Sequence, residues 1–311
     1  MGVESLRECG DFTPALTLPL LGGGDINTRH ALMRWRVVFY CIDNLTSESM
    51  LVNGVTSDSI SIRDRGLLYG DGVFRTVCVR QGIAQHWALH YQKLHHDCTV
   101  LAIPCPDFVL LSAELATLLP QHRDAVFKII VTRGVGTRGY APSATAQPTH
   151  IWDVAPLPAY PEHHAAQGIA ARFCDLRLGH QPRLAGVKHL NRLENVLAAA
   201  EWQDANIAEG LLLDVEDYVI EGTRSNVFLV INQRVVTPDL SRCGVAGLQR
   251  DRILAHTPVA IRRVTVDELL GADEVFLVNS LIGVWSIRAL ADRHWEHFPV
   301  AHRMRDMLAK E

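Results

Sequence analysis

The chain has 311 residues, of which 48% are hydrophobic and 21% charged, so we expect a globular protein long enough for two domains. A formal net charge of −4 gives no electrostatic reason to expect nucleic acid or an anionic membrane as a partner. The seven cysteines are scattered and form no C-x-x-C pair, which argues against a disulfide scaffold or zinc ribbon and indicates a reducing, cytoplasmic compartment. The longest apolar runs, such as FVLLSAELATLL, are shorter than the roughly 20 residues that a membrane-spanning helix needs.

Residues 1–49 differ in character from the rest of the chain. They contain the apolar stretch LTLPLLGGG, which Pro19 interrupts and which no cluster of positive charges precedes, so it does not suit a signal peptide. From Met50 onward, short apolar runs alternate with turn residues. We therefore expect residues 1–49 to be a poorly ordered N-terminal extension, or to precede the natural start, and the folded unit to begin at Met50.

Residues 50–156 are expected to form a small α+β domain that contains both strands and helices. An Asn-Gly turn follows the first strand, and the loop TRGVGTRGY closes the domain. The predicted strands are Met50–Val52, Val73–Arg80 and Ala125–Arg133, and the predicted helices lie near Leu89–Leu101 and Pro106–Leu119. Three prolines in Ala155–His164 favour an extended linker, which we place at residues 157–164.

Residues 165–311 are expected to form a larger domain, which begins with a strand near Gly168–Phe173. The runs GLLLD, YVIEG, NVFLVI and RVVTP are separated by Asp, Gly and Asn, which predicts an antiparallel meander. A helix should follow near Gly247. The segment VTVDELLGADEVFLVNS predicts a strand, a short helix and a buried strand that ends at Asn279 and Ser280.

The most informative stretch of the chain is LAGVKHLNRLENVL, which places Lys188 directly before a predicted amphipathic helix. Apolar residues recur there at the spacing of a buried helical stripe, at Leu190, Leu193, Val196 and Leu197. A lysine at such a junction can have a partly desolvated amine, and desolvation lowers the pKa of an amine. A neutral amine can form a Schiff base with a carbonyl group.

Three further features complete a chemical pattern. Glu221 ends a predicted strand, so its carboxylate could point into a cleft. The turn GVAGLQR offers unpaired backbone N–H groups at a helix N-terminus, where a phosphate dianion binds well, and Asn279 and Ser280 could add donors. A lysine for the aldehyde, an acid for the ring nitrogen and a cradle for the phosphate are what pyridoxal phosphate needs.

From Met50 onward the chain resembles the class IV, or branched-chain-type, pyridoxal-phosphate aminotransferases. The motifs that carry the resemblance occur in the family's order and are YGDGVF, TRGVGTRGY, LAGVKHLNRLENVL, VIEGTRSNVF and GADEVFLVNS. The resemblance implies the two-domain fold of type IV pyridoxal-phosphate enzymes: a small N-terminal α/β sandwich and a larger domain with a barrel-like, largely antiparallel sheet. It also implies a homodimer, with the cofactor between the two domains.

The resemblance implies roles for individual residues at the cofactor. Lys188 would hold the aldehyde as a Schiff base, and Glu221 would pair with the pyridinium nitrogen. The phosphate would lie on the backbone amides of Leu248 and Gln249, with help from the hydroxyl of Ser280.

At the substrate, Thr76 matches a threonine that assists proton transfer beside the lysine, and Asn279 matches an asparagine near the substrate. Arg138 matches a position that can meet a substrate carboxylate across a dimer interface.

The chain departs from the family's pattern at two positions. One is Lys93, which stands in HYQKL where the family has a phosphate-binding arginine. Lysine lacks the planar fork of arginine, so weaker cofactor retention is expected. A second departure, Arg75, would add positive charge to the pocket if it points inward or form an outward salt bridge if it does not.

Three features favour one branch of the family: the residue sequence of the Lys188 motif, Thr76 and Asn279. Enzymes of that branch eliminate pyruvate from 4-amino-4-deoxychorismate and release 4-aminobenzoate for folate biosynthesis. A D-amino-acid or branched-chain aminotransferase is the nearest alternative, because it uses the same lysine and glutamate. A catalytically weak protein that only binds pyridoxal phosphate is a further one.

The histidines suggest a metal hypothesis that we set aside. His86, His90, His95 and His96 occur in one helical stretch, and the first two are spaced to share a helix face. An acidic third ligand at suitable spacing is missing, so we expect a solvated helix surface there and no metal site.

Overall fold

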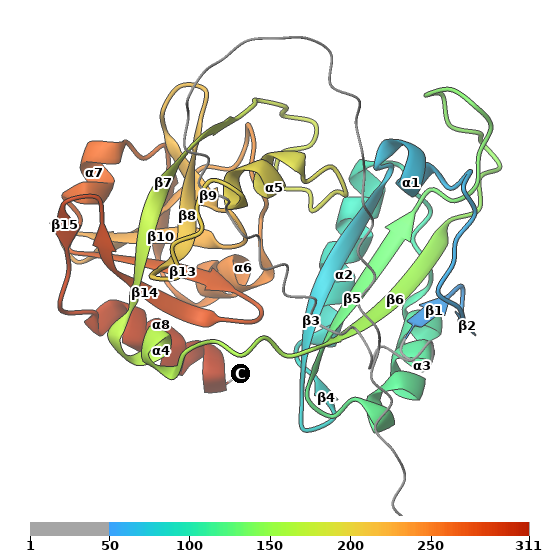
Figure 1. Ribbon diagram of the computed structural model, residues 1–311, viewed down its shortest axis with the longest axis horizontal. Coiled ribbons are helices and arrows are strands. Elements are labelled where there is room, and N and C mark those ends of the chain that lie inside the picture. The colour runs from blue at the N-terminus through green and yellow to red at the C-terminus, as the bar shows by residue number, and fades with distance from the viewer. Residues whose placement is uncertain (1–49, 311) are drawn as a thin grey trace, which may run out of the picture. The chain divides into compact units, whose positions relative to one another are not determined.

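The computed structural model describes residues 50–310, which belong to one compact unit. Within it, two β-sheets with separate hydrophobic cores define a small lobe, residues 50–156, and a large lobe, residues 169–310 (Figure 1). Because both lobes belong to one compact unit, their division into separate domains stays a prediction. The extension predicted over residues 1–49 lies outside the described residues. No helix within residues 50–310 is long and apolar enough to cross a membrane.

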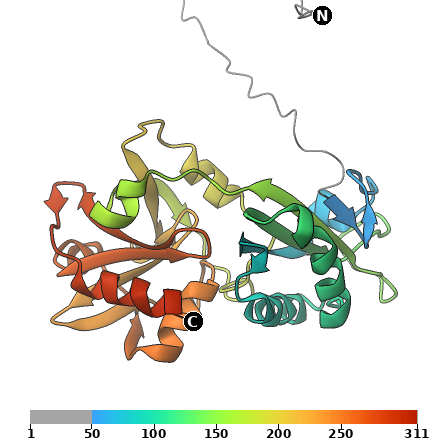
Figure 2. The ribbon, with the colours of Figure 1, turned by 90° about the horizontal axis from the view of Figure 1, so that it is seen from below.

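The small lobe is a six-stranded sheet in the order β2-β1-β6-β5-β3-β4, with α2 and α3 packed on one face (Figure 2). The strands are β1 (Met50–Val52), β2 (Val55–Thr56), β3 (Gly72–Arg80), β4 (Ile83–Ala84), β5 (Ala125–Thr132) and β6 (Thr149–Pro156). The helices are α1 (Arg65–Tyr69), α2 (Trp87–Val100) and α3 (Phe108–Leu118), followed by a 3₁₀ helix over Leu119–Gln121. Along β5 burial alternates from Ala125 to Val131, as expected of a strand with one face against helices.

These elements confirm the predicted order of strands and helices in the first part of the chain. The Asn-Gly turn between β1 and β2 has φ of 50° at Asn53 and 78° at Gly54. A two-residue hairpin turn of type I′ needs positive φ at both of its central positions, and Asn and Gly reach that region most easily. The Asn-Gly pair in the sequence therefore predicted this hairpin turn correctly.

In the large lobe, six strands close into a ring in the order β10-β13-β14-β7-β8-β9, because β9 also pairs with β10. Most neighbouring strands are antiparallel, whereas β7 runs parallel to both β14 and β8. This confirms the barrel-like, largely antiparallel sheet. The strands are β7 (Ile169–Leu178), β8 (Ile207–Asp214), β9 (Val219–Gly222), β10 (Asn226–Ile231), β11 (Arg234–Pro238), β12 (Val259–Arg262), β13 (Glu274–Asn279), β14 (Gly283–Leu290) and β15 (Arg293–His294). The helices around them are α4 (Glu162–Gln167), α5 (Leu193–Ala199), α6 (Leu248–His256), α7 (Val266–Leu270) and α8 (Pro299–Lys310).

Two predicted boundaries are wrong. The last residues of the predicted extended linker, 162–164, already belong to α4. The strand predicted at Val264 is absent from this part of the described chain, since β12 ends at Arg262. Thr265 instead starts α7 with a capping box, in which its side chain and that of Glu268 each accept a hydrogen bond from the other's backbone N–H.

The predicted burial of the stripe after Lys188 is also wrong. The side chains of Leu193, Val196 and Leu197 are 74%, 59% and 60% exposed. Helix α5 is only seven residues long, and Ala198 is its one fully buried residue. The three-and-four spacing thus indicated an amphipathic helix correctly, but this helix presents its apolar side to solvent in the described chain.

The segment around Lys188 joins the two lobes by backbone pairing. The amide of Phe74 donates to the carbonyl of Lys188 at 3.0 Å, and the amide of Leu190 donates to the carbonyl of Gly72 at 2.9 Å. Val73 and His189 form the antiparallel bridge between these two bonds. Residues 188–190 therefore continue the small-lobe sheet beside the start of β3, which places Lys188 at the junction of the lobes.

We expect the large-lobe core to tolerate truncation poorly. The rings of Phe228 and Phe276 stack with centroids 5.2 Å apart and are fully buried. Phe276→Ala removes one ring and leaves a cavity, so it should lower the free energy of unfolding by about 3–5 kcal/mol, measured by chemical denaturation. As a control, Val109→Ala removes apolar atoms from a side chain that is 73% exposed and should change stability by less than about 0.5 kcal/mol. Equal effects of the two substitutions would contradict this account of the core.

Candidate active site

A cavity of about 340 Å³ lies between the two lobes. Strand β3 and helix α2 form its small-lobe wall, and the Lys188 segment, the ends of β9 and β13 and the start of α6 form the rest. The residues lining it are Phe74, Arg75, Thr76, His90, Tyr160, Lys188, Arg192, Asn195, Glu221, Gly222, Thr223, Arg224, Ser225, Asn226, Val245, Gly247, Leu248, Val278, Asn279, Ser280 and Leu281. Six of the nine predicted site residues thus come together in one cavity.

Lys188 presents its amine to this cavity from a fixed backbone. Its amide donates to Asp97 Oδ2 at 3.1 Å, and its carbonyl accepts from Phe74. Its Nζ lies 4.6 Å from the centroid of the Phe74 ring. Burial and the nearby Arg75 charge lower the pKa of Lys188 to about 8, while Glu221 opposes that shift. This direction agrees with the desolvated, nucleophilic amine predicted from the sequence.

Glu221 is buried in β9, and one of its oxygens is held by the backbone. Oε2 accepts a hydrogen bond from the amide of Val245 at 2.8 Å. Burial raises the pKa of Glu221 to about 7, against the lowering effects of the Val245 bond and of Arg192 and Lys188. A carboxyl group with this pKa can share a proton with a basic ring nitrogen near neutral pH.

The start of α6 forms an open cradle of amides at the cavity wall. Its N-cap residue is Gly247, which has no side chain to occupy the first N–H groups of the helix. Asn226 fixes the approach to the helix, because its Nδ2 donates to the Val245 carbonyl at 2.7 Å and its Oδ1 accepts from the Gly247 amide at 2.9 Å. A Cβ at position 247 would lie 2.4 Å from Asn226 Oδ1, so any other residue would displace the Asn226 amide from this position.

A buried carboxylate supports the loop between β9 and β10. Glu209, only 1% exposed in β8, accepts hydrogen bonds from Thr223 Oγ1 and, at 2.9 Å, from Ser225 Oγ. Both hydroxyl residues belong to the cavity wall. The loop GTRS that follows Glu221 is therefore held against the cavity by buried polar bonds, which are costly to break.

Thr76, Asn279 and Ser280 reach the cavity as predicted. Thr76 follows Phe74 by two positions in β3, so both side chains project from the same face of the strand, beside Lys188. The amide of Asn279 is used by the backbone, since Nδ2 donates to the Arg224 carbonyl at 3.1 Å and Oδ1 accepts from Leu281 N–H at 2.8 Å. Asn279 thus fixes two loops of the wall.

The other predicted site residues lie outside the described cavity wall. The Lys93 ammonium forms an ion pair with Asp251. Arg138 is an exposed residue of the loop after β5. The side chain of Gln249 lines a neighbouring cavity and accepts from Arg252 at 2.8 Å. An acidic residue in the first turn of α6, Asp251, attracts the Lys93 ammonium group, which the sequence motif did not reveal.

Several wall residues had no role in the sequence analysis. His90 is 3% exposed, and burial, with the charge of Arg75, lowers its pKa to about 3. The solvated surface predicted for the histidine stretch is therefore wrong at this position, although His95 and His96 are exposed. Asn226 could have been found from its place at the start of the strand that follows the Glu221 turn.

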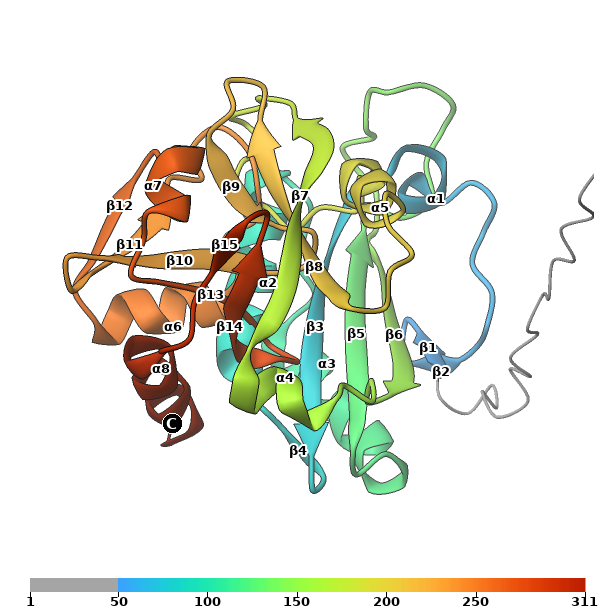
Figure 3. The same ribbon diagram turned by 60° about the vertical axis from the view of Figure 1, so that its left-hand side comes forward.

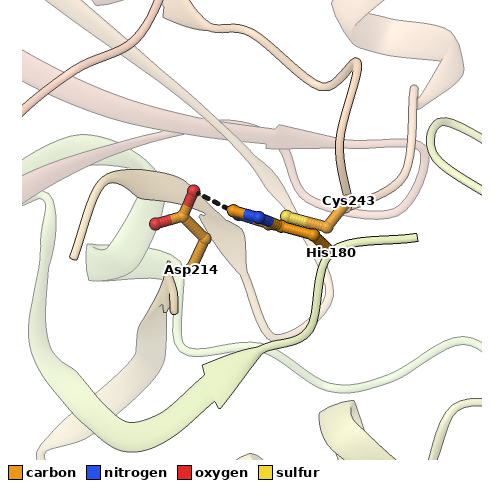
Figure 4. A group of neighbouring side chains, drawn as sticks. All are labelled: His180, Asp214 and Cys243. Atoms are coloured by element: carbon orange, nitrogen blue, oxygen red, sulfur yellow. Dashed lines mark hydrogen bonds and ion pairs between the residues drawn. The ribbon is translucent and has the colours of Figure 1, made fainter. Parts of the chain in front are cut away.

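A second group of polar side chains lies beside the loop that leads to α6, where His180, Asp214 and Cys243 approach one another (Figure 4). His180 Nε2 lies 2.9 Å from Asp214 Oδ2, while Asp214 Oδ1 accepts from the amides of Glu216 and Tyr218, both at 2.9 Å. Burial raises the pKa of Cys243 to about 12, so its thiol is protonated at neutral pH. The carboxylate is committed to the turn after β8, which assigns this group a structural role.

The cavity fits the chemistry of pyridoxal phosphate. It brings together an amine with a lowered pKa, a buried carboxyl group and an uncapped helix N-terminus. Arg75 Nε and His90 Nδ1 are buried at the wall, and residues 50–310 supply neither atom with a hydrogen-bond partner. A bound group with an aldehyde, a ring nitrogen and a phosphate would meet complementary groups here.

We expect the Lys188 amine to titrate near pH 8. Only the neutral amine reacts with an acylating reagent, so competitive labelling followed by mass spectrometry should give a midpoint near 8 for Lys188 in the cofactor-free protein, with exposed Lys310 as the internal reference. Arg75→Met removes a like charge and should raise that midpoint. A midpoint above about 10 in the unsubstituted protein would contradict the desolvation argument.

Comparison with known proteins identifies the family to which this chain belongs. A model described as amino-transferase class IV matches residues 72–290. An aminodeoxychorismate lyase of Vibrio harveyi is 37% identical over 262 residues, which cover 82% of this chain and 96% of that protein. A crystal structure of 4-amino-4-deoxychorismate lyase from Pseudomonas aeruginosa is 48% identical, with a TM-score of 0.81, over 84% of this chain and 98% of that one. A D-alanine aminotransferase of Bacillus licheniformis is 28% identical over 75% of this chain and 83% of that enzyme. The chain belongs to the class IV aminotransferase family.

Proposed function

We propose that this protein is a pyridoxal-phosphate-dependent lyase that converts 4-amino-4-deoxychorismate to 4-aminobenzoate and pyruvate, a step of folate biosynthesis. The observation that carries the proposal is the match to two lyases over more than four fifths of this chain, at 37% and 48% identity. The D-alanine aminotransferase matches at 28% identity over a smaller share of the chain. The arrangement of Lys188, Glu221 and the α6 N-terminus supports the cofactor.

When bound, pyridoxal phosphate would supply an electron sink that acidifies the C–H bond at the amine-bearing carbon of the substrate. Lys188 would take that proton, since it lines the cavity and its pKa of about 8 leaves roughly a tenth of the amine neutral at pH 7. Thr76 projects from the same face of β3 as Phe74, which lies against the amine, and would orient it. Loss of the proton, and of the enolpyruvyl group from the neighbouring carbon, makes the substrate ring aromatic, and the departing enolate takes up a proton to become pyruvate.

The remaining residues would hold the reactants in place. Glu221 would keep the ring nitrogen of the cofactor protonated, and the amides of Leu248 and Gln249, with Ser280, would bind its phosphate. Asn279 would act on the substrate through the loops that it fixes. Arg138, exposed on its loop, would meet a substrate carboxylate only if a second subunit places it there.

The proposal predicts that Lys188→Ala abolishes the lyase reaction. Release of 4-aminobenzoate and pyruvate in equal amounts should fall at least about 1,000-fold, since general acid–base catalysis contributes up to about 10⁴-fold and the cofactor also loses its anchor. Lys310→Ala, at an exposed lysine of α8, is the control and should keep full activity. If the unsubstituted protein instead forms keto acids from D-alanine or leucine with 2-oxoglutarate and releases no 4-aminobenzoate, the result would support an aminotransferase.

We further propose a homodimer that uses the apolar faces of α1 and α5. Both helices lie near the top of the view in Figure 3, and Asn191 Nδ2, just before α5, donates at 3.1 Å to the carbonyl of Gly70, the C-cap residue of α1. The two helices expose the apolar side chains of Leu67, Leu68, Leu193, Val196 and Leu197. Contiguous exposed apolar side chains are typical of subunit interfaces.

The double substitution Leu193→Glu with Leu197→Glu should convert this dimer to a monomer, because it places two charges in an apolar interface. Light scattering coupled to size-exclusion chromatography measures the change. Val215→Glu is the matched control, because Val215 lies in the turn after β8 and is 57% exposed. This substitution should leave the mass unchanged. A dimer that survives the double substitution would place the interface elsewhere.

A further inference from the structure

The small-lobe wall of the cavity contains a buried, ion-paired arginine with one unused hydrogen-bond donor. Arg75 is 2% exposed, and its Nη2 pairs with Asp97 and donates to the Lys93 carbonyl at 3.4 Å. Within residues 50–310, Arg75 Nε has no hydrogen-bond partner, and neither has Asp97 Oδ1. A buried guanidinium group with an unused donor is costly unless a ligand completes its bonds.

Arg75 belongs to the same cavity wall as the amide cradle of α6. Arg75, Gly247, Leu248 and Ser280 line the same cavity. Burial lowers the pKa of Arg75, and the carboxylates of Asp97 and, in the first turn of α6, Asp251 oppose that shift. Arg75 also donates to the carbonyl of Lys93, whose ammonium group pairs with Asp251, so these contacts connect Arg75 to the first turn of α6.

In this structure Lys93 contacts a carboxylate of α6 and not the cavity. Its ammonium group pairs with Asp251. An unpaired carboxylate in the first turn of α6 would repel a phosphate dianion at the same helix end. Lys93 cancels that repulsion, so it can favour an anion at α6 without touching it.

We propose that Arg75, from β3, is the residue that donates directly to the cofactor phosphate at the α6 N-terminus, while Lys93 acts only by neutralising Asp251. This inference rests on the proposed pyridoxal phosphate cofactor. The exchange keeps a planar guanidinium at the phosphate but delivers it from a strand of the small lobe instead of from α2. The weaker cofactor retention expected from Lys93 is then not required.

The test compares the affinities of the cofactor-free protein for pyridoxal phosphate and for pyridoxal, which lacks the phosphate. Binding is followed by absorbance of the lysine adduct, with inorganic phosphate as a competitor of the first ligand. Arg75→Met should weaken pyridoxal phosphate about 10- to 100-fold more than it weakens pyridoxal, because only the first ligand loses a charge-assisted hydrogen bond to its phosphate, whereas the change in the Lys188 amine affects both ligands alike. Since Arg75→Met leaves Asp97 buried and unpaired, Arg75→Met with Asp97→Asn provides a neutral pair that should fold and bind in the same way.

Lys93 provides the decisive comparison. Lys93→Met alone should weaken pyridoxal phosphate by exposing the Asp251 charge, and Lys93→Met with Asp251→Asn should restore the affinity. A double variant that stays weak would mean that Lys93 touches the phosphate, and an Arg75→Met, Asp97→Asn protein that binds both ligands normally would overturn the role of Arg75. If the unsubstituted protein binds neither ligand, the proposed cofactor itself is wrong, so the two failures are distinguishable.

Discussion

The backbone pairing of residues 188–190 with the start of β3 is the constraint on which the site depends. Two hydrogen bonds of 2.9 and 3.0 Å tie the lysine segment to the small-lobe sheet, while the residues before and after it belong to the large lobe. The pairing directs the Lys188 side chain toward the space between the lobes and sets Phe74 against its amine. A lysine on a mobile loop would be solvated, and its pKa would then stay near that of a free amine.

Buried charges organise the rest of the cavity, and each is held by particular hydrogen-bond donors. Asp97 pairs with Arg75 and accepts a hydrogen bond from the amide of Lys188. Glu221 accepts one from the amide of Val245, and Glu209 accepts hydrogen bonds from two hydroxyl groups of the loop after β9. Because uncompensated charges are expensive inside a protein, these contacts restrict the loops to one arrangement. Rigid placement of the amine, the carboxyl group and the helix N-terminus is what a cofactor-dependent lyase needs, since the cofactor supplies most of the chemistry.

The errors of sequence reasoning have a common cause. Leu193 and Leu197 have helical periodicity but face solvent, and His90 occurs in a polar, histidine-rich stretch but is buried under the cavity. Periodicity reports which residues share a face of a helix and says nothing about what covers that face. Likewise, the position of Lys93 in its motif could not reveal Asp251, which is 158 residues away in the chain and binds it across the lobes.

The sequence by itself determined the order and type of most elements, the Asn-Gly hairpin turn, the identity of the chemical groups at Lys188 and Glu221 and the glycine-rich start of α6. These features depend on local propensity and on residue identity, which a linear sequence carries directly. Only the tertiary structure decided that β9 closes the ring on β10, that Arg75 is buried in an ion pair with Asp97 of α2, and that Asn226 accepts a hydrogen bond from the Gly247 amide at the start of α6. Those outcomes depend on the desolvation and pairing of groups brought together by folding, and such energies have no counterpart in sequence spacing.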